Sequence, residues 1–189
     1  MDTNSQVKIL EAQIRECFGR VVWSHKTQEK CADIVSERHN TIKYIQIGLS
    51  ALTTTGVLIA VFGEHKIIGI IAAILSAILF AINTYVKDHD LGEIAQKHSD
   101  SASDLWNIRE EYFSLLTDLK AEVIGLEQLI QKRDLLQDRL SNVYKGSPRT
   151  INKAYKEATK ALKLNEELTL SDNEINMFLP NELKKEINE

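Results

Sequence analysis

The feature that most constrains this chain is a run of 38 residues, GLSALTTTGVLIAVFGEHKIIGIIAAILSAILFAINTY, that extends from residue 48 to residue 85. Only two of its side chains are charged, Glu64 and Lys66. The uncharged segments on either side of this pair, 44–62 and 67–86, hold 19 and 20 residues. Because about 20 helical residues cross a hydrocarbon core of roughly 30 Å, the sequence predicts two transmembrane helices.

Two other interpretations of this run are weaker. A signal peptide needs a basic region and a short apolar stretch at the start of a chain, whereas the first run begins at residue 44. A helical hairpin inside a soluble core needs cover on all sides, and the flanking segments are too polar and too amphipathic to provide it. The residues FGEHKI fit a loop over 63–66 in water, with Gly63 ending the first helix, because a charge at the bilayer centre costs about 2.5 to 3.5 kcal/mol.

A hairpin of this kind places both termini on one side of the membrane. Lys66 is the only Lys or Arg at the loop, whereas five basic residues flank the hairpin on the side of the termini: Lys30, Arg38, Lys43, Lys87 and Lys97. The positive-inside rule makes that side cytoplasmic. Cys17 and Cys31 then lie in a reducing compartment, where we expect small apolar packing residues rather than a disulfide.

Amphipathic helical arms flank the hairpin, over residues 1–43 and 87–145. The first arm follows the spacing of three and four of a heptad seam, with apolar residues at Val7, Leu10, Ile14, Cys17, Val21, Cys31, Val35 and Ile42. The polar residues Ser24, Gln28 and Arg38 fill the remaining positions of the same series. The second arm repeats the seam, interrupted only by Glu122 and Arg133, at Leu105, Ile108, Tyr112, Leu115, Leu119, Leu126, Leu129, Leu136, Leu140 and Val143. An unbroken helix over 91–143 would be about 80 Å long, but Gly92 and Gly125 weaken it and favour a break.

The predicted fold class is an all-α membrane protein, in which a two-helix transmembrane hairpin continues into antiparallel cytoplasmic coiled-coil arms. A helical tail over 146–189 follows. It begins at KGSPRT, where Gly146 and Pro148 end the second arm. The SDNE segment forms a capping box that starts a helix at Ser171.

The hairpin also predicts which residues of the two arms lie at equal height. Equal distances from the membrane pair Trp23 with Trp106, and add the ion pairs Lys26–Asp104 and Lys30–Asp100. We expect these contacts to zip the arms together. The segment WSHKTQEK at 23–30 is therefore interpreted first as a structural contact, and a ligand-sensing role is the alternative.

Within the hairpin, small residues recur every four positions on the second helix, at Gly69, Ala73, Ala77 and Ala81. They let another helix approach closely, inside the hairpin or between subunits. Polar side chains share a face on each helix: Gln46, Ser50, Thr53 and Thr54 on the first, and Ser76 and Asn83 on the second. Hydroxyls bond to their own backbone, but Gln46 and Asn83 are costly to leave facing lipid. The two amides predict interhelical hydrogen bonds or a narrow, weakly polar pore.

A single hairpin encloses no water path, so any pore needs several copies. The coiled-coil arms supply a means of homo-oligomerisation. The sequence contains no Walker loop, GxGxxG, HExxH, CxxC or nucleophile elbow, and its five His residues are scattered. With a net charge of -4 and no basic stripe, it gives no sign of nucleic-acid binding. We expect no enzyme activity, no metal and no cofactor.

The combined layout resembles a known family. The resemblance rests on four features. They are VVWSHKTQEKCAD in the first arm, the hairpin with its minimal loop, YVKDHDLGEIAQKHSDSASDLWNIREEYFSLLTDLK in the second arm, and AYKEATKALKLNEELTLSDNEINMFLP in the tail. These segments resemble the SLATT family, the SMODS- and SLOG-associating two-transmembrane effectors of bacteria. The resemblance marks two groups of characteristic positions without giving their role: Trp23, Lys26, Glu29 and Lys30, and Trp106, Arg109 and Glu110.

The resemblance implies a membrane-perforating effector of an antiphage system, located in the bacterial inner membrane. Such effectors are encoded beside enzymes that make or sense nucleotide second messengers. Because this chain has no recognisable nucleotide-binding domain, we expect a separate nucleotide-signal enzyme or sensor protein as its partner. The expected function is a gated oligomeric pore. A membrane-anchored coiled-coil scaffold that recruits a soluble partner, and a small regulatory subunit of another membrane complex, are the alternatives.

Overall fold

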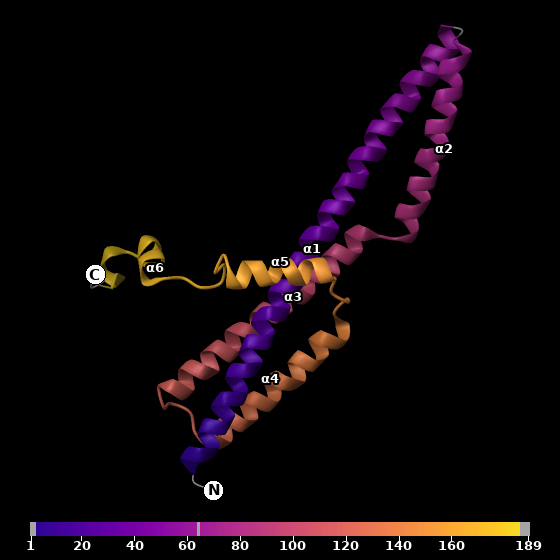
Figure 1. Cartoon of the computed structure of the whole chain (residues 1–189). Helices are drawn as coiled ribbons and strands as arrows, with labels where there is room; N and C mark the ends of the chain where they lie inside the picture. Colours follow the sequence, from indigo (N-terminus) through magenta and orange to yellow (C-terminus); the bar gives the residue numbers. More distant parts are fainter. Residues whose placement is uncertain (1–2, 64, 186–189) are drawn as a thin grey trace.

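The computed structural model describes residues 3–63 and 65–185, and every regular element in those ranges is a helix. In chain order these are α1 (Thr3–Phe62), α2 (Lys66–Asp88), α3 (Leu91–Lys120), α4 (Leu126–Gly146), α5 (Asn152–Lys163), α6 (Asp172–Phe178) and a short 3-10 helix, η1 (Asn181–Leu183) (Figure 1). The predicted all-α architecture is confirmed. Glu64, predicted to lie in the loop of the hairpin, is outside the described residues.

Helix α1 joins the first arm and the first span in one element of 60 residues, so the predicted boundary between residues 43 and 44 is not a break in the helix. The chain has no proline before Pro148, and nothing else interrupts the backbone hydrogen bonds of α1. α2 returns beside the distal half of α1 (Figure 1). Both helices are long and apolar enough to cross a membrane, and their most apolar stretches are almost wholly exposed. That exposure suits lipid and does not suit the core of a soluble protein.

The turn of the hairpin needs glycine at residue 63 because other atoms come close to it. The Gly63 N–H donates to the carbonyl of Ile59 over 2.9 Å. A Cβ atom at residue 63 would lie 2.7 Å from that carbonyl oxygen and 2.9 Å from Cδ2 of His65. Any larger residue would force the turn open.

Small residues form the contact between α1 and α2. A Cβ added to Gly56 would lie 3.1 Å from the Cβ of Ala72, and one added to Gly69 would lie 3.2 Å from the Cβ of Ala60. The two backbones therefore approach closely, as small residues permit in membrane helix pairs.

The chain breaks between α2 and α3 at His89 and Asp90. The ring of His89 stacks on Tyr85 with 4.7 Å between centroids. The Asp90 carboxylate accepts a hydrogen bond from the Glu93 N–H over 2.9 Å and caps α3. The return path of the hairpin is thus interrupted where α1 is continuous.

The stretch 87–145 is not one long helix. α3 ends at Lys120, and after a turn over 121–125 the chain folds back as α4, which lies alongside α1 and α3 (Figure 1). Glu122, one of the two interruptions in the predicted seam, takes a left-handed conformation with φ 55°. The arms therefore form a bundle of three helices instead of a two-arm coiled coil, because a seam residue that cannot be buried sits at the turn.

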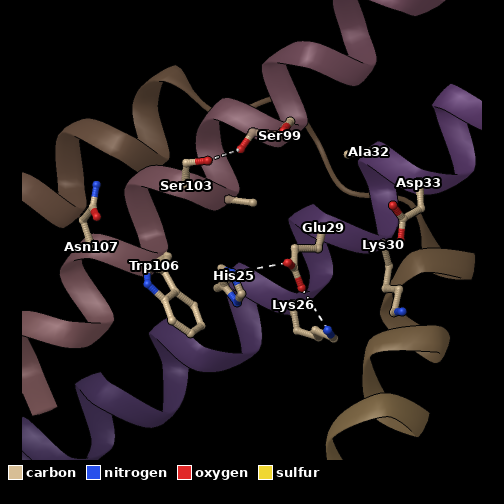
Figure 2. Close-up of a pocket in the computed structure, with 11 residues that line it drawn as sticks. His25, Lys26, Glu29, Lys30, Ala32, Asp33, Ser99, Ser103, Trp106 and Asn107 are labelled. Atoms are coloured by element: carbon tan, nitrogen blue, oxygen red, sulfur yellow. Dashed lines mark hydrogen bonds and ion pairs between the residues drawn. The ribbon is translucent and has the colours of Figure 1, made fainter. Parts of the chain in front are cut away.

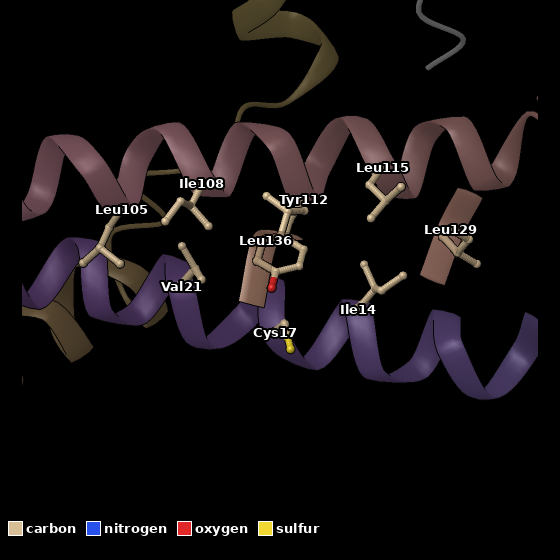
Figure 3. Packing of buried hydrophobic residues seen from close by; sticks show 9 residues of the cluster. All are labelled: Ile14, Cys17, Val21, Leu105, Ile108, Tyr112, Leu115, Leu129 and Leu136. Atoms are coloured by element: carbon tan, nitrogen blue, oxygen red, sulfur yellow. The ribbon is translucent and has the colours of Figure 1, made fainter. Parts of the chain in front are cut away.

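Nine side chains from α1, α3 and α4 make the core of this extramembrane bundle (Figure 3): Ile14, Cys17, Val21, Leu105, Ile108, Tyr112, Leu115, Leu129 and Leu136. All nine belong to the two predicted seams. Ion pairs join α3 and α4 on the surface, Arg139 with Glu111 over 2.5 Å and Lys132 with Asp118 over 3.1 Å. Burial raises the pKa of the Tyr112 hydroxyl, which faces Cys17.

The tail begins with α5, which crosses α1, and ends in a small unit around α6 (Figure 1). The predicted capping box is confirmed, since the Ser171 side chain accepts from the Glu174 N–H and the Glu174 carboxylate accepts from the Ser171 N–H.

Candidate functional site

One candidate site is the polar face of the hairpin. The side-chain amide of Gln46 on α1 donates to Oδ1 of Asn83 on α2 over 2.7 Å. Thr54 donates its hydroxyl to the carbonyl of Ser50 in its own helix over 2.9 Å. Thr53 lies half-buried, and its buried hydroxyl has no hydrogen-bond partner. The two amides thus form an interhelical hydrogen bond, as one of the two sequence-based hypotheses required.

The remaining polar residues lie near the same edge of the hairpin. Residues four apart on a helix are rotated by about 40°, so Ser50 and Thr54 step from Gln46 toward the exposed side of α1. Ser76 is seven residues before Asn83 and is rotated from it by only about 20°. Because Gln46 and Asn83 contact each other, both series start at the same edge, which we call the polar edge. Ser50, Thr54, Ser76 and Asn83 are all exposed along it.

The predicted small-residue ridge divides into two parts. Gly69 lies in the contact with α1, whereas Ala73, Ala77 and Ala81 are exposed on the outer side of α2. The packing partner of α1 is instead Ala72, which is buried. A spacing of exactly four drifts around the helix, so only one end of the ridge meets α1.

Away from the polar edge, the hairpin carries an apolar hollow of about 400 Å³, lined by Ile42, Ile45, Ile78, Ala81, Ile82 and Tyr85. Ile45 is rotated by about 100° from its neighbour Gln46, which separates this hollow from the amide pair. The hairpin therefore carries an apolar hollow on the side of Ile45 and Ile78, which we call the apolar edge, apart from the polar edge.

The second candidate site is the segment 23–30 of α1, which the structure buries despite its polarity. His25, Lys26, Thr27 and Gln28 are all buried there, between α3 and α5. Burial of four consecutive polar residues is costly unless each finds a partner. The partners therefore determine what the segment does.

His25 and Trp106 form the contact between α1 and α3 at this level. Their ring centroids lie 5.2 Å apart (Figure 2). The Arg109 guanidinium lies 4.5 Å from the centroid of the Trp106 ring. Arg109 also pairs with its neighbour Glu110. Burial lowers the pKa of His25, against an opposing effect of the Glu29 carboxylate, whose oxygen lies 3.7 Å from Nε2.

The predicted pairing of the arms is wrong in its partners. Trp23 packs against Tyr155 of α5 instead of Trp106, in a tilted arrangement with 5.6 Å between ring centroids. Lys26 pairs with Glu29 over 2.9 Å and with Glu167 over 2.8 Å, and Lys30 lies 3.8 Å from Glu167. Of the two predicted acidic partners, Asp104 is exposed and Asp100 accepts from Gln96 within α3.

The physical reason is rotation about the helix axis. Counting residues from the membrane fixes height, and His25, two residues from Trp23, does meet Trp106. The residue count does not fix which face of α1 points to α3. Trp23 faces α5, and Lys26 pairs with Glu167 in the turn that follows α5. The sequence pattern did not predict the position of these segments over α1.

A buried polar chain ties three elements together behind this contact. Nδ1 of His98 on α3 donates to Oε1 of Gln28, and the Gln28 amide donates to the carbonyl of Pro148 over 3.3 Å. Burial lowers the pKa of His98. Sequence reasoning placed Gln28 in the seam but missed His98 and Pro148, because a polar residue in a heptad position carries no sign of its partner.

A groove of about 480 Å³ lies between α1 and α3 beside this chain (Figure 2). Its walls carry the basic residues Lys26 and Lys30 and the acidic residues Glu29 and Asp33, so their charges balance. Ser99, Ser103 and Asn107 add neutral polar groups from α3. The groove favours neither an anion nor a cation by net charge.

Comparison with known proteins identifies a family. A model of the SMODS and SLOG-associating 2TM effector domain family 4 matches residues 10–174, which include the bundle, the hairpin, α5 and the start of α6. No curated protein and no solved structure matches the chain at a significant level. The two exposed apolar helices account for the two transmembrane segments in the family description. This chain is a membrane protein that belongs to the SMODS and SLOG-associating 2TM effector domain family 4.

Proposed function

We propose that the chain is the pore-forming effector of a bacterial antiphage system, an oligomer that permeabilises the inner membrane when it is activated. The observation that carries the proposal is the polar edge, a line of amide and hydroxyl groups on a predominantly apolar hairpin. It centres on the hydrogen bond between Gln46 and Asn83.

Polar groups that face lipid are costly, and they commonly mark ion or substrate pathways. In a ring of hairpins, polar edges turned inward would line a shared lumen, while the apolar edge with Ile45 and Ile78 would face lipid or a neighbouring copy. In the closed state Gln46 and Asn83 bond to each other, which reduces their need for water. Opening exchanges that bond for water in the lumen.

The proposed orientation in the membrane rests on the basic residues beside the hairpin, and the proposed activating partner rests on the family description. The basic residues that flank the hairpin on the side of the bundle support a cytoplasmic location for both termini. The family description names association with SMODS and SLOG, which supports a nucleotide-signal enzyme or sensor protein as the activating partner. The arms then receive the signal on the same side of the membrane as this partner.

The test is membrane potential in cells that carry the chain with its neighbouring genes and a voltage-sensitive dye. We expect phage infection to depolarise cells with the wild-type chain, and the variant Gln46→Leu with Asn83→Leu to insert normally but to depolarise them far less. The matched control is Ile45→Leu with Ile78→Leu, two changes of similar size on the apolar edge, which should leave depolarisation unchanged. Full depolarisation by the Gln46 and Asn83 double variant would remove the polar edge from the pore.

A membrane-anchored scaffold is the second candidate, and the α6 unit favours it. Asn176 exchanges two hydrogen bonds with the backbone of Lys185, at 2.9 and 3.0 Å, and Lys185 pairs with Asp172 over 3.2 Å. This unit nevertheless leaves Met177 and Phe178 74% and 79% exposed. A preorganised unit with exposed apolar side chains suits the recruitment of a partner. The scaffold predicts no depolarisation even when the whole system is active.

A further inference from the structure

Helix α5 packs on α1 through a face built for close approach. Its buried residues Ala154, Ala158 and Ala161 recur at spacings of four and three, which is one side of a helix. α5 crosses α1 at the level of the buried polar segment (Figure 1). With alanine at each contact, specificity must come from the larger groups around this face.

Trp23 of α1 supplies the first of these groups. Its ring packs against Tyr155 and lies 5.4 Å from the ammonium of Lys163, in the last turn of α5. One indole thus contacts residues near both ends of the helix, through an aromatic contact with Tyr155 and a cation–π contact with Lys163.

Glu167 supplies the second group. Its carboxylate forms ion pairs with Lys26 at 2.8 Å and with Lys30 at 3.8 Å. The turn that aims it at α1 includes Glu166 in the left-handed region, with φ 52°, and a hydrogen bond from the Glu167 N–H to the carbonyl of Ala161 over 3.1 Å. Burial lowers the pKa of Lys26, but hydrogen bonds to Glu167 and Glu29 outweigh it and raise the pKa above its usual value. Lys26 is thus charged and buried, and it depends on both carboxylates.

The connection to α4 is held at the same level of α1. The Pro148 carbonyl accepts from Gln28, and the Ser24 hydroxyl lies 2.9 Å from the hydroxyl of Tyr144 at the end of α4. The N–H of Ile151 bonds to the fully buried thiol of Cys31, which lowers the pKa of that thiol, although burial outweighs it and raises the pKa. Cys31 is therefore a native probe of whether this segment is closed over α1.

The two helices of the hairpin differ in how they are connected to the bundle. α1 is a single helix from Thr3 to Phe62, so a rotation at Lys26 reaches Gln46, about 30 Å away, through unbroken backbone hydrogen bonds. The return path is interrupted at His89 and Asp90. Contacts that fix the rotation of α1 at Lys26 therefore also fix the rotation of the polar edge at Gln46.

We infer that α5 and its following turn to Glu167 form a latch that keeps α1 in the closed rotation, and that release of this latch opens the pore. This inference rests on the proposed pore function and adds the contact that keeps the pore closed. In the closed state Glu167 neutralises Lys26 and Lys30, and Trp23 is covered. Without the latch, Lys26 retains only Glu29, so rotation of Lys26 toward water is favoured.

The test uses the full-length chain in membranes and two readouts. Glu167→Lys reverses the charge that faces Lys26 and Lys30, and Tyr155→Ala removes the aromatic contact with Trp23 by an independent route. Glu157→Lys is the matched control, because it makes the same charge change at an exposed residue of α5. Maleimide labelling of Cys31, identified by peptide mapping, reports the latch, and dye-detected depolarisation of uninfected cells reports the pore.

We expect both latch variants to label Cys31 at least tenfold faster than wild type and to depolarise cells without infection, while Glu157→Lys does neither. Unchanged labelling in both variants would overturn the latch. Fast labelling without depolarisation, in cells where infection still depolarises the wild type, would overturn its control of the pore. If infection does not depolarise even wild-type cells, the pore proposal fails, and the labelling alone decides whether α5 is releasable.

Discussion

The side chains of Gln46 and Asn83 form a hydrogen bond of 2.7 Å between the two helices of the hairpin. Gln46 lies two residues inside the predicted first span, so the bond sits at the end of the hairpin nearest the bundle. The two groups are the only amide side chains in the predicted spans. Each is the partner that makes the other tolerable in an apolar surrounding.

We predict that replacing one amide costs more than replacing both. Gln46→Leu or Asn83→Leu leaves an amide without a partner, whereas the double variant leaves none. Interhelical hydrogen bonds in membranes contribute about 0.6 to 2 kcal/mol. A double-mutant cycle on thermal unfolding in detergent should therefore give a coupling energy in that range. Additive effects of the two single changes would mean that the bond contributes nothing to stability.

The second prediction concerns α4, the helix that makes the bundle three-stranded. Leu136 is 4% exposed in the core, while its neighbour Leu135 is 60% exposed. Leu136→Ala should lower the free energy of unfolding by about 2 to 5 kcal/mol, and Leu135→Ala by no more than about 0.5 kcal/mol. Denaturant unfolding followed by circular dichroism measures both. Equal effects would show that α4 does not pack in this rotation.

Hydrophobic periodicity predicted most of the fold. All nine core residues of the bundle belong to the two seams, and both spans match the hairpin helices, because apolar spacing and length are local properties of the sequence. The fold-back at 121–125 is also marked in the sequence, by Glu122 at a seam position. The seam alone does not state that α4 turns back onto α1, since a straight and a folded helix share the same pattern.

The candidate sites were predicted less well. Gln46 and Asn83 were found because amides in lipid are rare, and their contact was one of two stated hypotheses. The partners of Trp23 and Lys26 were not found, because Tyr155 and Glu167 lie more than 130 residues away and no spacing rule connects them. The alanines of α5, Ala154, Ala158 and Ala161, were the available signal: a face of small residues predicts a close helix contact.

The third prediction follows from the left-handed conformation of Glu122, with φ 55°. Such a conformation costs a non-glycine residue about 1 to 2 kcal/mol. Glu122→Gly should therefore raise the thermal midpoint of the bundle, and Glu122→Val should lower it. Gly125 has negative φ and open space around it, so Gly125→Ser adds an N-cap to α4 and should also stabilise. A stabilising Glu122→Val would contradict the turn.

The fourth prediction separates the two faces of α1 within the hairpin. A side chain at Gly56 meets Ala72, whereas one at Gly48 meets nothing within 4 Å. Gly56→Ile should push α2 away and lower hairpin stability by about 1 to 3 kcal/mol, while Gly48→Ile faces outward and should be tolerated. Thermal unfolding of the two purified variants in detergent compares them directly. A destabilising Gly48→Ile beside a neutral Gly56→Ile would place α2 on the other face.

The last prediction is a pH dependence of the bundle. Burial lowers the pKa of both His98 and His25 below 6.5, their usual value, and no other charged group is found to shift His98. Their folded pKa values thus lie below the unfolded one, so the unfolded chain binds more protons in the pH window between the folded pKa values and about 6.5. The stability that the two neutral histidines preserve is fully present above about pH 6.5. It is lost as the pH drops toward the folded pKa values.

Unfolding of the purified protein should therefore require less denaturant at pH 5.5 than at pH 7.5. His98→Gln keeps a side-chain donor for Gln28 and removes one titrating group, so its stability should depend less steeply on pH in this window. The Lys26–Glu167 ion pair does not contribute to this slope, because the pKa of Glu167 is lowered from 4.5 by its bond to Lys26, and Glu167 stays ionised throughout. An unchanged slope in His98→Gln would mean that His98 is not the group that acid protonates on unfolding.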